Sequence, residues 1–522
     1  MLDGDVITPA TTAGSIEQSK LRKAVGRADT LVLMLCALVG LDTLGAVSSD
    51  GAQAITWLAA LALFFFVPYA LLTAELGSAF PDEGGPYVWT KLAFGRLTGA
   101  VTSIFYWISN PFWLGGTLSI TAVSTFSAFF IDLHGAGKYV FSLAFIWIAV
   151  GSAVLSFRVG RWIPIIGAWV RVILLGGFTL TVLAYAVEHG VHGFGASAFR
   201  PSYSVFILAA PILFFSFQGF ELPSTAGGEM KNPRRDVPFA IARGAFGTVL
   251  MYGLPILAIL IVLPAGQVSS LGGFIDAMKT VFTVYGGHVA ANGAATLTGM
   301  GRALGDIAAA GFIWALLSSG SSWIIGADRT QAVAGYDGAA PRALGIFSTR
   351  FGTPIVVNLA SGVVATAVMV LAFVLTSGNA GKYFSVVLGV TISTTAISYC
   401  AIFPALIRLR YTHPDVRRPF RVPGGLPGAW IVGGLATAWA LFAAIMLVWP
   451  GLGSANPDAS LPSGFAGQRV QFELSQIVPL LAIVALGVVF YALGAPTRAS
   501  RQDAVESEAA AADGELKPAV PA

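Results

Sequence analysis

The chain has 522 residues, of which 56% are hydrophobic and only 11% are charged, whereas about 25% of the residues of a soluble protein are charged. This composition excludes an ordinary soluble protein and predicts a lipid bilayer crossed several times. The net charge of +4 does not indicate nucleic-acid binding, because the basic residues fall in the loops expected on the cytoplasmic side. The two cysteines, Cys36 and Cys400, lie inside apolar stretches and have neither disulfide-framework nor metal-ligand spacing.

The first 26 residues are polar and contain no apolar core of a signal peptide, so the first span is expected to target the chain to the membrane. Twelve apolar stretches follow, each near or above the ~20 residues that a membrane helix needs. They lie at about 29–50, 54–77, 97–130, 138–157, 161–187, 205–228, 238–264, 304–326, 354–376, 381–407, 427–449 and 474–494. A polar, alanine-rich tail that we expect to be disordered closes the chain at 498–522.

The distribution of lysine and arginine gives the orientation of these spans. With the N-terminus inside, cytoplasmic segments hold 23 of these residues and outside segments hold 6. Short cytoplasmic loops are enriched in Lys and Arg. Both termini are therefore expected in the cytoplasm of a multi-pass plasma-membrane protein.

Polar residues interrupt the first and sixth spans, which lie five spans apart. Five-span units beginning there would have opposite orientations, which is typical of inverted repeats with a binding site at the midplane. We therefore expect an all-α membrane protein with twelve transmembrane helices and broken helices 1 and 6. Its expected parts are a tail at 1–26, repeats at 27–187 and 205–407, two further spans at 427–494 and a tail at 498–522.

The first span contains Gly40, Leu41, Asp42, Thr43 and Gly45 at mid-membrane depth. If the helix breaks there, its second half begins with free N–H groups, which suit a carboxylate. The charge of Asp42 would repel such a group. Asp42 or Thr43 would then cap the second half-helix, or Asp42 would act as a counter-ion for an amine or as a proton carrier.

Two further polar residues lie within the third and fifth spans. Asn110 precedes Pro111 and offers an amide either to a ligand or to a neighbouring helix. Arg171 lies about 15 Å into its span at 1.5 Å per residue. At that depth an arginine needs a partner, for which Asp42 and Glu221 are the candidates, unless it snorkels to the interface. Because arginine keeps its proton, it can serve as a fixed cation but not as a proton carrier.

The sixth span loses its apolar character after Phe217, where Gln218, Gly219, Glu221 and Pro223 follow within six residues. A non-helical break at this depth must line a cavity or be buried in protein. A glutamate there would cost about 2.5–3.5 kcal/mol unless it served a polar site. The broken helix and its acid are typical of a transporter.

No arrangement of residues suggests an enzyme, a cofactor or a metal. The sequence contains no P-loop, no GxSxG and no HExxH pattern, and its five histidines all fall in loops. Transport energy is therefore expected from a gradient or from exchange.

Three motifs in the right order resemble the amino acid–polyamine–organocation (APC) permeases, from the first span to the loop after the tenth. They are GFEL with GEMKNPRRDVP at 219–222 and 228–238, AELG with PDEGGPYVW at 74–77 and 81–89, and HPDVRRPFRVP at 413–423. The resemblance implies the leucine-transporter-type fold with a 5+5 inverted repeat. It also implies that a substrate carboxylate rests on amides of the first span and its amine on carbonyls of the sixth.

The resemblance also implies roles for single residues. Phe215, next to Ser216, would gate the substrate, and Glu221 would serve the gate and proton coupling. Trp107 and Asn110 would face the substrate side chain. Arg171 falls near a lysine that replaces sodium in some members, which implies independence of sodium.

The first span departs from the family's G-x-G-x-G run, as it does in glutamate–GABA exchangers and plant polyamine carriers. We therefore expect a permease for amino acids or related amines, driven by protons or exchange. The alternatives are a putrescine or spermidine carrier and a glutamate/GABA-type antiporter. A sensor or scaffold would show no saturable flux. A channel is not expected, because the sequence contains no filter-like repeat.

Overall fold

The computed structural model describes residues 21, 23, 25–155, 162–191, 195–263, 268–376, 378–462 and 464–500. Most of the expected tails at 1–26 and 498–522 lie outside the described residues, as do residues 158–161, which contain two arginines and follow the fourth expected span. Within the described part, eleven helices are long and apolar enough to cross a membrane, and Tyr203–Ser216 is a shorter apolar helix. Tyr203–Ser216 overlaps the expected sixth span at 205–228 and is too short to count as a membrane-length helix.

The described elements are helices, apart from one small hairpin. The first half of the chain forms α2 (Arg27–Leu38), η1 (Leu41–Thr43), α3 (Leu44–Ser48), α4 (Gln53–Leu61), η2 (Ala62–Phe66), α5 (Val67–Ala79), α6 (Gly85–Phe94), α7 (Arg96–Trp113), η3 (Leu114–Leu118), α8 (Ser119–Phe129), α9 (Ala136–Val154), α11 (Trp162–His189) and η4 (Ala196–Phe199). The second half forms α12 (Tyr203–Ser216), η5 (Leu222–Glu229), α13 (Pro233–Val262), α14 (Gly273–Phe282), η7 (Thr283–Tyr285), β1 (Gly287–Val289), β2 (Ala295–Leu297), α15 (Gly299–Tyr336), η8 (Arg342–Gly345), α16 (Ile355–Leu375), α17 (Ala380–Ile402), α18 (Ala405–Thr412), α19 (Gly425–Val448), η9 (Pro457–Ser460) and α20 (Arg469–Leu493).

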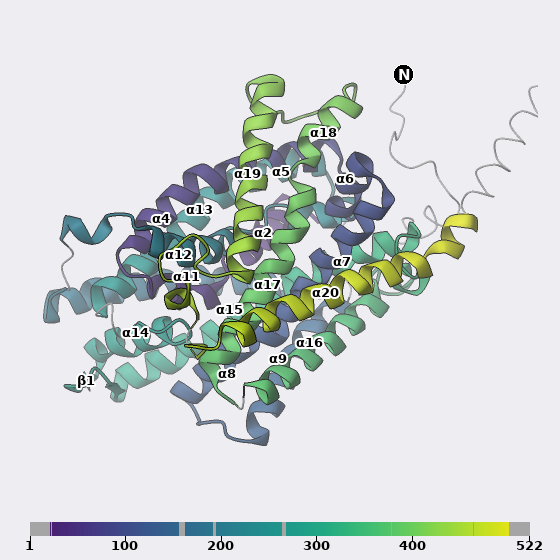
Figure 1. Ribbon diagram of the computed structural model, residues 1–522. Helices are drawn as coiled ribbons and strands as arrows, with labels where there is room; N and C mark the ends of the chain where they lie inside the picture. The colour runs from purple at the N-terminus through teal and green to yellow at the C-terminus, as the bar shows by residue number, and fades with distance from the viewer. Residues whose placement is uncertain are drawn as a thin grey trace, which may run out of the picture.

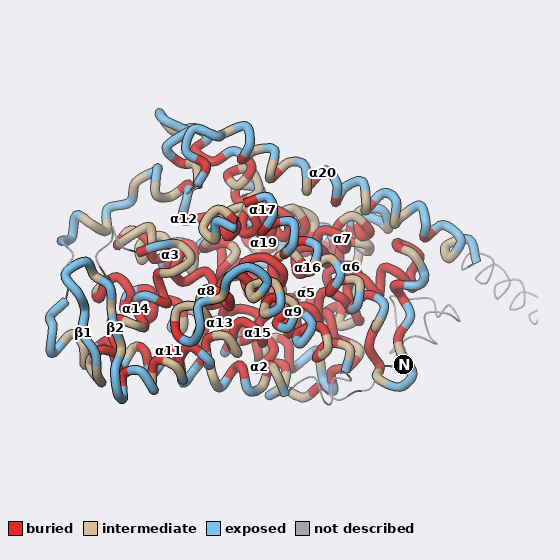
Figure 2. The backbone as a smooth tube through the Cα atoms, turned by 90° about the horizontal axis from the view of Figure 1, so that it is seen from below, coloured by how far each residue is buried: buried red, intermediate tan, exposed pale blue. Residues whose placement is uncertain are grey.

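Four membrane-length segments form the centre of the molecule. The most apolar window of Arg27–Ser48 is 83% buried and that of Ala380–Thr412 is 78% buried, whereas only 22% of the window in α20 is buried. Arg96–Phe129 and Gly299–Tyr336 are the other two central segments. Buried residues concentrate around them in Figure 2, and α20 runs along the outside in Figure 1.

Glycines allow the long third segment to pack against its neighbours. The segment passes from α7 to α8 through the π-helical turn η3, which contains Gly115 and Gly116. A Cβ atom at Gly115 would lie 2.0 Å from the carbonyl oxygen of Ala365 in α16, and one at Gly116 would lie 1.9 Å from Val387 in α17. A π-turn of this kind often marks a functional site, and here it lies beside the central cavity described below.

The two ends of the molecule differ. Helices α6 and α18 lie at one end, and α14 and the antiparallel hairpin β1–β2 lie at the opposite end (Figure 1). The segment from α14 to the hairpin connects α13 to α15.

Candidate functional site

The first membrane segment breaks where the sequence predicted. Helix α2 ends at Leu38, and Gly40 has extended backbone angles (φ −79°, ψ 112°) before η1 begins. One side chain contacts both peptide groups of Gly40, because the Tyr252 hydroxyl accepts from the Gly40 N–H at 2.8 Å and lies 2.9 Å from the Gly40 carbonyl. Tyr252 belongs to α13, so the break is fixed by a tertiary contact that local sequence does not reveal.

The sixth segment is broken as well. Helix α12 ends at Ser216, η5 begins at Leu222, and Gly219 between them has a φ of +129°, which side chains other than glycine rarely adopt. The N–H groups of Gly219 and Phe220 donate to the Tyr69 hydroxyl at 3.0 and 3.1 Å. The non-helical backbone is therefore buried and hydrogen-bonded, as the membrane interior requires.

A central cavity with an empty volume of about 360 Å³ lies between the two breaks. The Ser216 hydroxyl donates to the Thr43 hydroxyl at 3.0 Å and so joins the two breaks directly. Six of the predicted substrate-binding residues line this cavity: Gly40, Thr43, Asn110, Phe215, Ser216 and Gln218. Leu41, Asp42, Gly45 and Gly219 are not among the lining residues.

The sequence did not identify several other residues that line the cavity. They are Ser109, Trp113, Tyr252, Trp323, Thr391 and Thr395. The threonines and the tyrosine are polar residues within apolar helices, which was the available signal, but many such residues only bond to their own helix. Phe215 lies edge-to-face against Trp113, with ring centroids 5.7 Å apart, so an aromatic pair forms part of the wall.

Three polar atoms on this wall are available to a ligand. The amide oxygen and nitrogen of Gln218 and the hydroxyl oxygen of Thr391 are buried and have no hydrogen-bond partner within the described structure. Buried polar atoms are normally paired. The cavity therefore offers a donor and two acceptors to a small polar molecule, and its lining carries no charged side chain.

The hydrogen bonds of Asp42 differ from those of a helix cap. Its Oδ2 accepts from Trp113 Nε1 at 2.8 Å and from Thr117 Oγ1 at 2.7 Å. Neither Asp42 nor Thr43 makes a side-chain capping bond at η1 or α3, so the capping interpretation is wrong. The Thr43 hydroxyl instead bonds to the Gly40 carbonyl at 3.1 Å. Asp42 acts on the cavity through the Trp113 indole, which it orients.

Glu221 is fully buried in a cage of three tyrosines from three helices. Its Oε1 accepts from Tyr106 at 2.9 Å and from Tyr399 at 2.6 Å, and its Oε2 accepts from Tyr69. No ion pair to Glu221 occurs among the residues that the structure describes. The cage was not predicted, because its members lie far apart in the chain.

Arg171 is completely buried, which rules out snorkelling, and its partners are all neutral. Its guanidinium donates to the Val39 carbonyl at 3.0 Å and the Ala315 carbonyl at 2.6 Å, and also to Cys36, Ser318 and Ser319. The expected pairing with Asp42 or Glu221 is wrong for the described residues. The arginine instead holds the end of α2 against the serine-rich part of α15.

Trp107 does not face the cavity as the resemblance implied. Its Nε1 donates to Asp328 Oδ1 at 3.0 Å and to Ser361 at 2.8 Å, which links α7 to α15 and α16. Asn110 lines the cavity and also donates to the Trp323 carbonyl at 3.2 Å. The helix–helix bond that the sequence left open is therefore present, and the asparagine also lies at the cavity wall.

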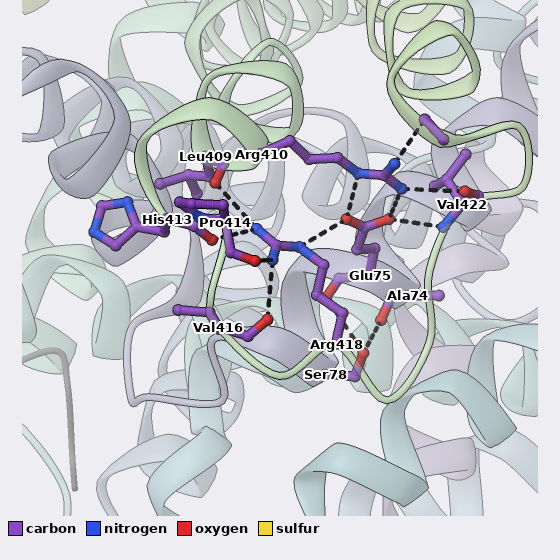
Figure 3. Close-up of polar contacts among 11 residues, drawn as sticks. Ala74, Glu75, Ser78, Leu409, Arg410, His413, Pro414, Val416, Arg418 and Val422 are labelled. Atoms are coloured by element: carbon purple, nitrogen blue, oxygen red, sulfur yellow. Dashed lines mark hydrogen bonds and ion pairs between the residues drawn. The ribbon is translucent and has the colours of Figure 1, made fainter.

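A buried ion cluster explains the two motifs at 74–77 and 413–423 (Figure 3). Glu75 of α5 bonds Arg410 of α18 at 2.8 and 2.5 Å, Arg418 at 3.1 Å and the Val422 N–H at 2.7 Å. Arg410 also donates to the Val422 carbonyl, and Arg418 to the His413 and Val416 carbonyls, all in the loop after α18. These contacts hold the loop after α18 against α5. None of the cluster residues lines the central cavity.

A second ion cluster joins η5 to α15. Arg329 contacts Glu229 at 2.9 Å and Glu83 at 3.3 Å, and Glu83 also accepts the Gly228 N–H at 2.9 Å. Burial and the neighbouring Glu229 carboxylate raise the pKa of Glu83, against the opposing effect of Arg329. Within the described residues, no group of three His, Cys, Asp or Glu side chains could hold a metal ion.

Comparison with known proteins gives consistent matches. A family model described as "Amino acid permease" matches residues 26–465. An uncharacterized transporter of Legionella pneumophila is 28% identical over 77% of this chain and 85% of its own length. The probable agmatine/putrescine antiporter AguD of Lactococcus lactis is 26% identical over 76% of this chain and 81% of its own. The polyamine transporter PUT1 of Oryza sativa is 25% identical over 70% of this chain and 63% of its own.

Proposed function

The chain belongs to the amino acid permease family, and from this premise we propose that it moves amino acids or related amines by alternating access, driven by protons or by exchange. The protein is a multi-pass membrane transporter of the APC type. The proposal concerns its span arrangement, its substrate contacts and its coupling.

We propose twelve spans, on the basis of the two breaks, and both termini in the cytoplasm, on the basis of the basic residues. The short helix α12 and η5 lie on either side of the non-helical residues 217–221 and together account for the sixth span. The first repeat would comprise 27–187 and the second 205–407, followed by two spans at 427–494. The bias of basic residues toward one set of loops supports the orientation.

The central cavity supports the substrate contacts, and its unpaired polar wall is the observation that carries the proposal. Gln218 and Thr391 would bond the polar groups of the substrate, since these atoms otherwise stay buried without partners. Amides at the start of η1 would receive a carboxylate, and carbonyls at the break after Ser216 would receive an amine. Phe215 and Trp113 would close over the apolar part.

Glu221 is proposed as the proton-binding group. Its carboxylate is fully buried, and the three tyrosine hydroxyls around it are neutral, so its charge is balanced by hydrogen bonds alone. An uncompensated buried charge is costly, which makes proton uptake a favourable alternative. Arg171 would be a fixed cation whose donors are all engaged by neutral groups, which supports independence of sodium.

A diamine or polyamine is the second candidate for the substrate. Two of the relatives have names that refer to agmatine, putrescine or polyamines. The uncharged lining of the central cavity favours a zwitterionic amino acid instead. Both candidates carry an ammonium group, and a transport assay separates them.

The test is uptake into proteoliposomes with a labelled panel of amino acids, agmatine, putrescine and spermidine, with and without a pH gradient and with and without preloaded substrate. We expect saturable uptake of one class, and its absence for every compound would refute the proposal. Thr391→Val should weaken uptake because it removes an unpaired lining hydroxyl. Thr394→Val is the matched control, because the Thr394 hydroxyl bonds to its own helix at 2.9 Å.

A further inference from the structure

A second cavity lies at the end of the molecule opposite α18. It is open to solvent and has an empty volume of about 760 Å³ between α8, the loop before α14 and the start of α17. Serine hydroxyls from Ser124, Ser269 and Ser270 and the ring of Phe384 line it. Figure 1 shows α14 and α8 at this end, far from α18.

One charged side chain lines this outer cavity, the carboxylate of Asp276 in the first turn of α14. No hydrogen bond or ion pair to this carboxylate occurs within the described part of the chain. The nearby Lys279 places its ammonium 5.4 Å from the centre of the Phe129 ring and also interacts electrostatically with Asp276, without a direct ion pair. The outer cavity thus combines a carboxylate without a direct hydrogen-bond partner, hydroxyl acceptors and an aromatic ring, which together suit an ammonium group.

Two elements of the fold connect the walls of the outer cavity and the central cavity. A Cβ atom at Gly45 of α3 would lie 2.7 Å from the Ser270 carbonyl oxygen, so the loop of the outer cavity rests directly on the broken first span. Phe384 in the outer cavity and Thr391 in the central cavity belong to α17 and are seven residues apart. Residues seven apart lie on one helix face, separated by about 10.5 Å.

We propose that the outer cavity is a docking site for the ammonium group of an amine, with Asp276 as its counter-ion. The inference rests on the proposed function, because the ligand is a transported amine that approaches from this end. A carboxylate at the mouth of a transport path mainly raises the local concentration of a cation and its rate of encounter. The site should therefore bind weakly and lose its effect at high salt.

The test measures protection of a cysteine in the cavity and does not require transport. A Ser270→Cys variant of the full chain in proteoliposomes is labelled with a membrane-impermeant maleimide, with putrescine as the probe. We expect millimolar putrescine to slow the labelling severalfold at low ionic strength. Adding Asp276→Asn should abolish the protection. Adding Asp132→Asn should preserve it, because Asp132 pairs with His134 at 3.2 Å and does not line the cavity.

The possible results separate this inference from the proposed function. Labelling that putrescine does not slow, or protection that persists with Asp276→Asn, overturns the docking site even when amine uptake is normal. Protection that depends on Asp276 supports the docking site even in a preparation without flux, where the proposed function fails by itself. Each variant of this test should have the same size-exclusion profile as the parent protein, which excludes misfolding as the cause of a change in labelling.

Discussion

Replacing Glu75 by glutamine tests whether the ion cluster of Figure 3 stabilises the fold. The change keeps the shape of the side chain but leaves two buried arginines without their shared anion, since the Arg410 and Arg418 side chains are 2% and 8% exposed. Removing one partner of a buried ion pair typically costs about 3–5 kcal/mol. Arg410 keeps the carbonyls of Val422 and Gly425 at 3.1 and 2.6 Å, so we expect the lower end.

About 3 kcal/mol corresponds to a change of roughly a hundredfold in the unfolding equilibrium. It should lower the apparent melting temperature of the purified protein in detergent by about 5 °C, measured as the monodisperse fraction after heating. Ser78→Ala is the control, because Ser78 lies one turn away on α5 and bonds only within its helix, to the Ala74 and Glu75 carbonyls. The reasoning is refuted if the two variants melt at the same temperature.

Arg410→Met in the Glu75→Gln background extends the test. It removes one of the unpaired cations, so the double variant should be less destabilised than the sum of the two single variants. Additive effects would mean that the two side chains do not interact energetically.

Three further predictions concern transport. Glu221→Gln should flatten the pH dependence of uptake, because an amide cannot take up a proton, and an unchanged pH profile would exclude Glu221 as the coupling group. Arg171→Lys should lower uptake at least about tenfold, since an ammonium cannot reproduce the planar fork of donors, and full activity would show that charge alone matters. Phe215→Ala should raise the KM by roughly two- to tenfold through loss of its contact with Trp113, and unaltered kinetics would contradict a gating role.

The sequence predicted the helices and both breaks well, because these depend on local properties. A glycine, a proline or a carboxylate inside an apolar stretch is visible without knowledge of the fold, as at Gly40 and Gly219. The partners of the buried charges were not predictable in this way. A helix cap was one of the roles considered for Asp42, which instead accepts a hydrogen bond from Trp113, and Arg171 was expected to meet an acid and instead meets neutral groups.

The physical reason is that a buried charge can be balanced either by an opposite charge or by several dipoles. A list of ionisable residues suggests only the opposite charge as a partner and gives no indication of the dipoles. The tyrosines around Glu221 come from α5, α7 and α17, and nothing in their local sequence distinguishes them from other buried aromatic residues. Contacts between residues of separate helices can be identified only once the fold is known.

The tyrosine cage also determines which oxygen of Glu221 can carry a proton. A phenolic oxygen has two lone pairs, and on Tyr69 both are taken by the N–H groups of Gly219 and Phe220. Tyr69 is therefore a donor at this site, either to Glu221 or to the Tyr399 hydroxyl 3.1 Å away, and it has no lone pair left for a protonated carboxyl. If Glu221 takes up a proton, we expect the proton on Oε1, the oxygen that Tyr106 and Tyr399 contact. Protonation would then change the contacts to α7 and α17, while the bond from α5 to the broken sixth segment stays the same.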